Sequence, residues 1–357
     1  MSDPVADAMS DSAVRAAFRQ QAEACRTLGS PFTARLCALS ADRLAADHGQ
    51  AARRVLAWPG DPSPRGQAVP LRLMGALHAL VLSGRSSGLA AVYPPHETAD
   101  DDGLWQAVTD ALAEHDEWIL AWLASPPQTN EVQRANGLFA GLSYLAERFG
   151  LPLVLSEVGS SAGLNLNMAL YGYRFAEQVF GMPESPLQLA PAWQGPPPPK
   201  GHVEVVEREG CDLNPLDPAS PEHRLRLQAF LWPDQQDRLA RLRSALDLAV
   251  AERPPVVEAD AVTWIAGRLA EVRPGRCHVI FHSIVLQYFP EAARAAFAER
   301  IERALGEAPS TAPLAWLQME ADGQRPGAAL TVRMSGEPAA RLLARIDFHG
   351  RWVDWRG

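Results

Sequence analysis

Residues 153–166 have the sequence LVLSEVGSSAGLNL. An aliphatic run, typical of a buried strand, contains Glu157 near its end and leads through Gly159 and Gly163 into a stretch that resembles a helix. Glycine tolerates the positive φ angles of a tight turn and lets the backbone approach a ligand closely. Two interpretations are open: a structural strand-to-helix turn, or a nucleotide or nucleoside site at the end of the strand.

The sequence around this stretch predicts an α/β fold. From residue 151 onward, short aliphatic runs alternate with helical stretches, as expected of parallel strands buried on both faces. Beyond residue 330 the alternation of apolar and polar residues predicts an antiparallel end to the sheet. The expected parallel strands are 152–156, 202–207, 256–259, 278–282 and 314–319.

The first 126 residues have a different pattern. Their apolar residues recur with the period of an α-helix, and no strand pattern interrupts them. We therefore expect an all-helical region over 1–126 and an α/β domain over 127–357. A proline-rich insertion near 173–201 is expected to be an exposed excursion or a short hairpin.

Composition and charge narrow the classes of partner. The 357 residues carry a formal net charge of -9, which argues against a nucleic-acid backbone or an anionic membrane as the main partner. The four cysteines have no spacing typical of a metal site, and no metal is expected. The acidic N-terminal stretch 1–14 lacks the apolar core of a signal peptide, so a cytoplasmic protein is expected.

The turn after the first strand resembles the start of the cofactor motif in S-adenosylmethionine (SAM) methyltransferases. A dinucleotide fingerprint would place a glycine at Ser161 and would lack the acid two residues before its first glycine. In the methyltransferase form, Glu157 would orient the methionine end of SAM. The turn Gly159, Ser160, Ser161 and Gly163 would make room for the cofactor.

Two further acids follow the second and third expected strands. By the same resemblance, Asp212 would bond the ribose hydroxyls, and Asp260 beside the small Ala261 would bond the adenine amino group. Each acid also has a structural interpretation. Asp212 could be an ordinary residue of a polar turn, and Asp260 could be the N-cap of a helix.

Candidate catalytic groups come from two other places. His282 and Ser283 end the fourth strand, where the histidine could act as a general base and the serine could line the cofactor site. Glu131 and Arg134 lie in the first turn of a helix expected to begin near Thr129, and they could orient a substrate, with Arg134 binding a carboxylate. A structural strand-end histidine and a solvated first turn are the alternatives.

Six blocks of the sequence, taken in order, resemble a bacterial family catalogued as a domain of unknown function (number two-three-three-two). They are PQTNEVQRANGL, SEVGSSAGLNLN, EREGCDLNPLDP, AFLWPDQQDRLARLRSAL, ADAV and VIFHSIVLQYFP. That family is thought to be similar to Rossmann-type methyltransferases. The resemblance covers nearly the whole chain and implies a Rossmann-like fold. The residues at positions that match the blocks are Glu157, Gly159, Gly163, Asp212, Asp260, His282 and Ser283.

We therefore predict a SAM-dependent methyltransferase-like enzyme that acts on a small molecule, with the helical region as a lid. Two alternatives remain open. One is a non-catalytic protein that binds a nucleoside or SAM, and the other is an NAD(P)-dependent oxidoreductase. The sequence does not indicate the methyl acceptor or the oligomeric state.

Overall fold

The computed structural model describes residues 4–96 and 100–357 and divides the chain into two compact units. The first unit contains the described residues up to Thr129 together with Ser220–Ala240, and the second contains Asn130–Ala219 and Arg241–Gly357. Ser220–Ala240, which the sequence pattern assigned to the α/β region, therefore packs with the N-terminal helices. Of the N-terminal stretch used above to predict the location of the protein, residues 1–3 lie outside the described residues.

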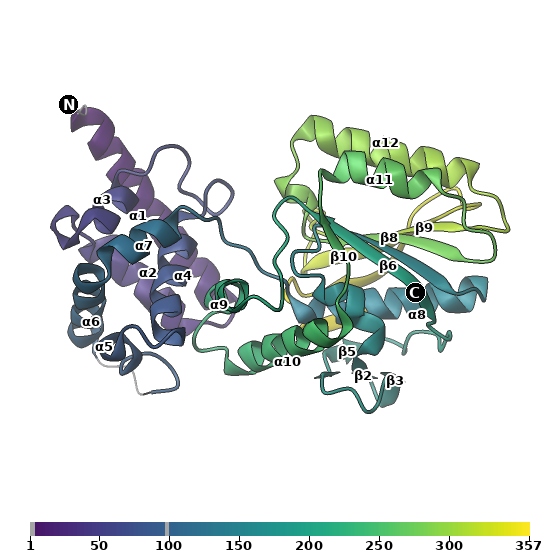
Figure 1. Cartoon of the computed structure of the whole chain (residues 1–357), viewed down its shortest axis with the longest axis horizontal. Helices are drawn as coiled ribbons and strands as arrows, with labels where there is room; N and C mark the ends of the chain where they lie inside the picture. The colour runs from purple at the N-terminus through teal and green to yellow at the C-terminus, as the bar shows by residue number, and fades with distance from the viewer. Residues whose placement is uncertain (1–3, 97–99) are drawn as a thin grey trace. The chain divides into compact units, whose positions relative to one another are not determined.

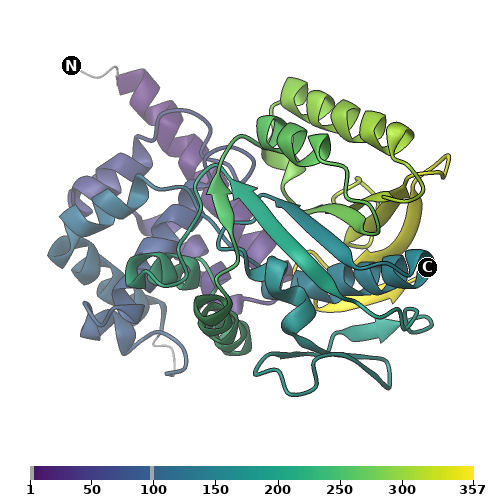
Figure 2. The ribbon, with the colours of Figure 1, turned by 45° about the vertical axis from the view of Figure 1, so that its right-hand side comes forward.

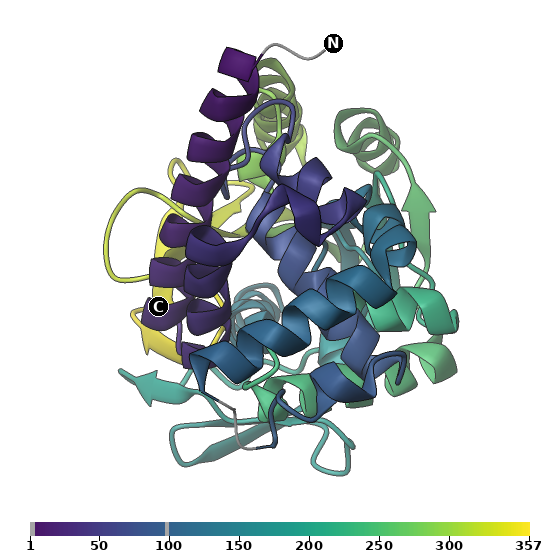
Figure 3. The ribbon, with the colours of Figure 1, turned by 90° about the vertical axis from the view of Figure 1, so that its left-hand side faces the viewer.

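The first unit is built from helices around one apolar core (Figure 3). Its helices are α1 (Pro4–Thr27), α2 (Pro31–Arg43), η1 (Ala46–His48), α3 (Gln50–Leu56), α4 (Val69–Leu82), α5 (Ser87–Ala90), α6 (Asp101–Glu114), α7 (Asp116–Leu123) and α9 (Pro221–Ala229). Helix α10 (Gln236–Glu252) begins in this unit and continues into the second.

Asp234, from the WPDQ block, has a structural role in the first unit. Its Oδ1 accepts the hydroxyl of Ser30 at 2.5 Å, and its Oδ2 accepts the N–H of Phe32 at 2.9 Å. It thereby satisfies backbone and side-chain donors at the start of α2, where a helix lacks internal partners.

The second unit contains a nine-stranded sheet in the order β5-β12-β11-β10-β9-β8-β1-β6-β7. Strands β7, β6, β1, β8 and β9 are parallel, and β10, β11 and β12 follow as antiparallel neighbours. The predicted α/β fold, with a mostly parallel sheet, an antiparallel C-terminal part and a helical N-terminal region, is confirmed. The strands are β1 (Leu153–Val158), β5 (Ala192–Gln194), β6 (Val205–Asp212), β7 (Val256–Glu258), β8 (Cys277–Ser283), β9 (Leu314–Glu320), β10 (Ala328–Met334), β11 (Arg341–Ile346) and β12 (Trp352–Trp355).

Helices cover both faces of this sheet (Figure 1). Helices α11 (Ala261–Ala270) and α12 (Glu291–Glu307) pack on one face, and α8 (Ala135–Phe149) packs on the other against β9, β10 and β11. Gly141 allows α8 to approach closely, because a Cβ there would lie 2.7 Å from Cδ1 of Leu317. The sheet is therefore buried on both sides, which explains the continuous aliphatic runs of its central strands.

The long connection between β1 and β6 holds the proline-rich insertion. It contains η3 (Leu164–Leu170) and a small sheet of β2 (Gly172–Phe175), β3 (Gln178–Gly181) and β4 (Gln188–Leu189). Figure 2 shows this small sheet and its loops beside the main sheet. Strand β5 then joins the main sheet beside β12, so the insertion is more ordered than an exposed excursion.

Strand β6 extends further than its aliphatic residues predicted. It continues to Asp212 instead of ending near Glu207, because the polar side chains of Glu207 and Glu209 are paired with residues of the neighbouring helix α11. No helix within the described residues is long and apolar enough to cross a bilayer.

Candidate functional site

Five carboxylates lie at the carboxyl ends of the parallel strands, which we call the carboxyl edge. Glu157 is the penultimate residue of β1, Asp260 follows β7, and the last residues of β6, β7 and β9 are Asp212, Glu258 and Glu320. The register places Val158 opposite Cys211 and Asp212 opposite Glu258. Three acids predicted from the sequence thus end three adjacent strands, next to the point between β1 and β8 where the strand order reverses. Ligands of doubly wound sheets bind at such a point.

The turn after β1 requires glycine at both predicted positions. Gly159 and Gly163 have φ angles of +70° and +71°, and Ser161 between them has +55°. A Cβ at Gly159 would lie 2.4 Å from Cγ2 of Val285, and one at Gly163 would lie 2.8 Å from Cγ2 of Val256. Backbone strain of this kind in a non-glycine residue such as Ser161 is concentrated at functional sites.

The strand β6 accepts the first N–H groups of this turn. The carbonyl of Cys211 accepts the N–H groups of Gly159 and Ser160 at 2.9 and 3.1 Å. Asp212 Oδ2 accepts the N–H of Ser161 at 2.8 Å, while its Oδ1 accepts the N–H of Asn214 at 2.9 Å. Asp212 therefore holds the turn, and its carboxylate keeps further acceptor sites, since each oxygen has two lone pairs.

Asn130 accepts two further N–H groups of the segment that leads into η3, and the carbonyl of Ser160 accepts that of Gly163. Its Oδ1 lies 3.3 Å from the N of Ala162 and 3.0 Å from the N of Leu164. The helix α8 begins only at Ala135, and not near Thr129 as the sequence suggested, so Asn130 lies before the helix. Because protein groups accept the N–H groups of the turn, the turn does not present them to a pyrophosphate as a dinucleotide fingerprint does.

Glu157 is a buried carboxyl with an unpaired oxygen. Its side chain is 2% exposed, and its Oε2 has no hydrogen-bond partner. Burial raises its pKa well above the usual range, the charge of Asp212 raises it further, and Asn165 and Arg134 lower it less. A buried polar atom without a partner needs an explanation such as a water or a ligand.

Other unpaired buried atoms lie on the segment that follows Glu157. Ser161 Oγ, Asn165 Oδ1 and both amide atoms of Asn167 have no hydrogen-bond partner, and the three side chains are at most 3% exposed. Most of these atoms are acceptors, so the segment suits a ligand rich in N–H or O–H donors. Sequence reasoning missed Asn165 and Asn167. Two asparagines that lie two positions apart in an otherwise apolar stretch are a signal that could have identified them.

Asp260 is the N-cap of α11, as its structural interpretation predicted. Its Oδ1 accepts the N–H of Thr263 at 3.0 Å and lies 3.1 Å from the Thr263 hydroxyl. The residue is exposed, and Ala261 beside it is buried as the first residue of the helix. The capping geometry leaves the second carboxylate oxygen for another donor.

His282 does not have the rim position that the sequence suggested. It is fully buried beneath α12, with its ring 6.0 Å from that of Phe297. Trp316 Nε1 donates to His282 Nε2 at 3.0 Å, and His282 Nδ1 lies 2.7 Å from Glu320 Oε1. Since an indole only donates, Nε2 is the acceptor and Nδ1 carries the hydrogen. Both nitrogens are engaged with protein groups, so the arrangement does not fit a general base.

Glu320 is the group that the histidine holds. In addition to His282 Nδ1–H, its Oε1 accepts the N–H groups of Val285 and Leu286 at 3.0 and 3.4 Å. The residue before Val285, Ile284, has a φ of +53°, which is strained for a β-branched side chain. Sequence reasoning missed Glu320, although it ends its strand as the other acids do.

Glu131 and Arg134 hold the backbone in this structure. Glu131 is 3% exposed and its Oε1 accepts the N–H of Gln133 at 3.2 Å, at the start of η2 (Val132–Arg134). Arg134 donates to the carbonyls of Phe348 and Ser283 at 3.1 and 3.2 Å. The segment is therefore not a solvated first turn, which was the alternative interpretation, and the role of Glu131 and Arg134 in orienting a substrate stays a prediction. The segment links the end of β8, including Ser283, to the C-terminal hairpin.

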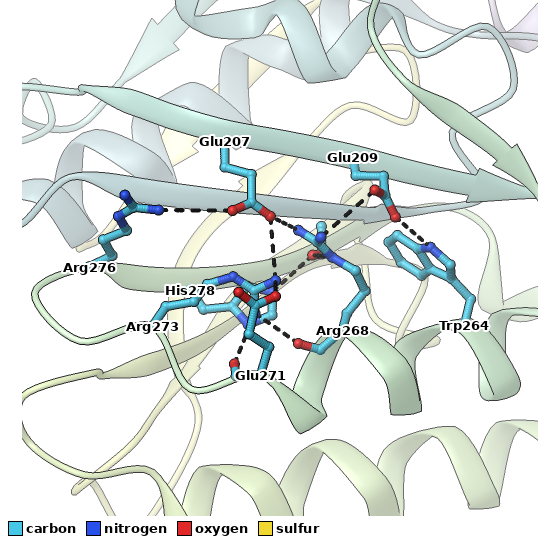
Figure 4. Close-up of polar contacts among 9 residues, drawn as sticks. Glu207, Glu209, Trp264, Arg268, Glu271, Arg273, Arg276 and His278 are labelled. Atoms are coloured by element: carbon cyan, nitrogen blue, oxygen red, sulfur yellow. Dashed lines mark hydrogen bonds and ion pairs between the residues drawn. The ribbon is translucent and has the colours of Figure 1, made fainter.

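Carboxylates nearer the amino ends of the strands are neutralised by arginines (Figure 4). Arg268 lies 2.7 Å from Glu207 and 3.8 Å from Glu209, and Arg273 lies 3.4 Å from Glu207. Trp264 Nε1 also donates to Glu209 at 2.9 Å. These contacts attach α11 to the sheet and leave both acids with a cationic partner.

The acids at the carboxyl edge have no such partner. Within residues 4–96 and 100–357, no arginine or lysine forms an ion pair with Glu157, Asp212, Asp260 or Glu320, and the pair of Glu320 is with the neutral tautomer of His282. The same described part of the chain contains no group of three or more His, Cys, Asp or Glu side chains placed to hold a metal ion. Burial and the charge of Asp212 raise the pKa of Glu157 more than Arg134 lowers it. The carboxyl edge therefore has more acids than arginines and lysines, which favours a cationic ligand.

A comparison with curated proteins found no match. A comparison with family models matched residues 15–355 to a family described as "Uncharacterized protein conserved in bacteria (DUF2332)". The match includes both units and every candidate residue discussed above. The chain therefore belongs to this bacterial family of uncharacterised proteins.

Proposed function

We propose that the protein is a SAM-dependent methyltransferase-like enzyme that acts on a small molecule. The observation that carries the proposal is the row of acids at the carboxyl edge that form no ion pair with an arginine or lysine of the described residues, together with the unpaired Oε2 of Glu157. SAM has a sulfonium and an ammonium group and is an overall cation, so its charge matches this edge. A dinucleotide has an anionic pyrophosphate, which the acids and the occupied N–H groups of the turn disfavour.

The residues present fit the parts of the cofactor. Asp260 and Ala261 would hold the adenine, and Asp212 would accept from the ribose hydroxyls with its remaining lone pairs. Glu157, with the unpaired oxygen of Asn165, would hold the ammonium group. SAM supplies an electrophilic methyl group, and the enzyme would act by orienting an acceptor and excluding water.

The acidic composition supports a small neutral or basic acceptor. With a formal charge of -9, the chain would repel an anionic polymer. A non-catalytic protein that binds SAM or a nucleoside is the second candidate, because His282, the predicted base, has both ring nitrogens occupied.

Isothermal titration of the full chain with SAM, S-adenosylhomocysteine (SAH) and NAD⁺ tests the proposal. We expect binding of SAM and SAH and no binding of NAD⁺. Binding of NAD⁺ alone, or of none of the three, would contradict it. Transfer of a labelled methyl group from SAM to a panel of small amines, alcohols and thiols then separates an enzyme from the binding protein.

A matched pair of variants tests the adenine position. Asp260→Ser keeps a good helix N-cap but removes the carboxylate, whereas Asp260→Ala removes both. If the carboxylate binds adenine, both changes weaken SAH binding by about tenfold or more, which corresponds to about 1.4 kcal/mol. SAH affinity that is unchanged in Asp260→Ser would exclude Asp260 from the site.

A further inference from the structure

We infer that Glu320 is a ligand-binding carboxylate that selects a cationic sulfonium, and hence SAM, over its neutral product SAH. This inference rests on the proposed function and extends it to a residue outside the cofactor motif. The two carboxylate oxygens of Glu320 differ in their hydrogen bonds to the protein.

One oxygen of Glu320 carries all of its contacts with the protein. Oε1 accepts from His282 Nδ1 and from the N–H groups of Val285 and Leu286. The side chain is 16% exposed, and Glu320 is the last residue of β9 at the carboxyl edge. These three donors fix the orientation of the carboxylate, so Oε2 is held in place to attract a cationic ligand by its charge.

A carboxylate is not needed to hold the turn after β8. The amide oxygen of a glutamine would accept the same three hydrogen bonds without placing a charge in a largely buried position. A buried charge without a partner costs free energy, and no arginine or lysine of the described residues forms an ion pair with Glu320. Glu207 at the other end of the sheet shows the alternative, because Arg268 and Arg273 neutralise it. The missing cation at Glu320 is therefore assigned to a ligand.

The position of Glu320 fits the reacting end of the cofactor. Its partner Val285 packs against Gly159, since a Cβ at that glycine would lie 2.4 Å from Val285 Cγ2. Glu157, Asp212 and Asp260 lie on the β1, β6 and β7 side of the turn, and Glu320 lies on the β8 and β9 side. With the nucleoside on the first side, the sulfonium faces the second. The unpaired Oε2 of Glu157, 2% exposed, is an independent sign that this edge takes a ligand.

Trp316 and His282 act as positioning residues in this arrangement. Trp316 Nε1–H fixes His282 Nε2 as an acceptor, which leaves Nδ1–H to donate to Glu320. This chain of hydrogen bonds runs from the core under α12 to the carboxyl edge. The contact between the buried His282 and the carboxylate of Glu320 thus has a positioning role, and no proton transfer to a substrate is needed to explain it.

Titration of SAM and SAH into the wild-type chain and Glu320→Gln tests the inference. Glutamine keeps one oxygen for the three donors and replaces the other carboxylate oxygen, with its charge, by a neutral NH2 group. We expect the Kd for SAM to rise by about tenfold or more, because a sulfonium a few ångströms from a carboxylate is strongly attracted, and the Kd for SAH to change by less than about threefold. The control is Glu258→Gln, an exposed acid at the end of β7, which should change neither value.

Each outcome separates the inference from the proposed function. A wild-type chain that binds neither ligand defeats both. If the wild type binds both ligands and Glu320→Gln loses the same factor of affinity for SAM and for SAH, Glu320 only supports the turn. That result overturns the inference while the proposed function stands. Unchanged affinities in Glu320→Gln, or the same selective loss in Glu258→Gln, overturn it as well.

Discussion

Asp212 Oδ2 accepts the backbone N–H of Ser161 at 2.8 Å, so the acid that ends β6 holds the glycine turn that follows β1. The register of the two strands brings these residues together although they are 51 positions apart in the chain. One side chain thus supports the turn and presents further lone pairs to a ligand. Its structural and proposed binding roles are properties of the same carboxylate.

Asp212→Ala should destabilise the protein. It leaves the N–H groups of Ser161 and Asn214 without their acceptor, and an unsatisfied donor costs about 1–3 kcal/mol. We expect a decrease in the free energy of unfolding within that range, measured by urea denaturation. Asp212→Asn keeps one amide oxygen and should lose less. Equal stability of the alanine variant and the wild type would show that Asp212 does not hold the turn.

Glu157 should make the stability depend on pH. Its pKa is raised in the folded state by burial and by Asp212, so the folded protein binds the proton more tightly than the unfolded chain. The stability from this group is complete below the ordinary glutamate pKa of about 4.3 and is lost as the pH rises toward the raised value, by at most about 1.4 kcal/mol per pH unit. Urea denaturation between pH 4 and 7 should show that the free energy of unfolding of Glu157→Gln increases relative to that of the wild type as the pH rises. A constant difference would contradict the assignment.

His278 should make the stability depend on pH in the opposite direction. Its Nε2 lies 2.8 Å from Ser156 Oγ, and burial, with Arg273 and Arg268 nearby, lowers its pKa to about 3. The unfolded chain takes up a proton below the ordinary histidine pKa of about 6.5, so stability is lost as the pH falls from that value toward 3, by up to about 1.4 kcal/mol per unit.

Comparing His278→Gln with the wild type between pH 4 and 7 isolates this term. Glutamine stays neutral, so the loss of stability at low pH should be smaller in the variant. The exposed His202 provides the control, and His202→Gln should follow the wild-type curve. Parallel curves for the wild type and His278→Gln would show that His278 is not held neutral.

Two glycine-to-alanine changes should alter the stability of the protein in opposite directions. In Gly141→Ala, the new Cβ would lie 2.7 and 2.9 Å from the two Cδ atoms of Leu317, so α8 must move from the sheet, at a cost of about 1–3 kcal/mol. Gly267 in α11 has no atom within 4 Å of an added Cβ, and alanine there should stabilise the helix by up to about 1 kcal/mol. Thermal unfolding of both variants measures the difference. A stabilised Gly141→Ala would mean that α8 does not pack at this distance.

The sequence predicted best those features in which a residue's role depends on the strand, turn or helix to which it belongs. The aliphatic runs predicted the parallel strands, because strands covered on both faces need apolar side chains throughout. The glycines at 159 and 163 marked a turn with positive φ, and Asp260 before a helical run marked an N-cap. These features depend on neighbours a few residues away.

The partners of the side chains depended on the fold. His282 at a strand end has the same local sequence whether it faces solvent or lies under α12, and only the packing of Phe297 and Trp316 decides this. The sequence pattern ended β6 too early for a similar reason. Glu207 and Glu209 of this strand are paired with Arg268, a residue of α11 about 60 positions later in the chain.

The sequence by itself determined the α/β class, the helical N-terminal region and three of the acids at the strand ends, Glu157, Asp212 and Asp260, since periodicity and turn chemistry are local. The tertiary structure decided which of these acids have a cation beside them and which do not. That distinction depends on contacts between distant segments, because the energy of a buried charge is set by whatever the fold places within a few ångströms of it.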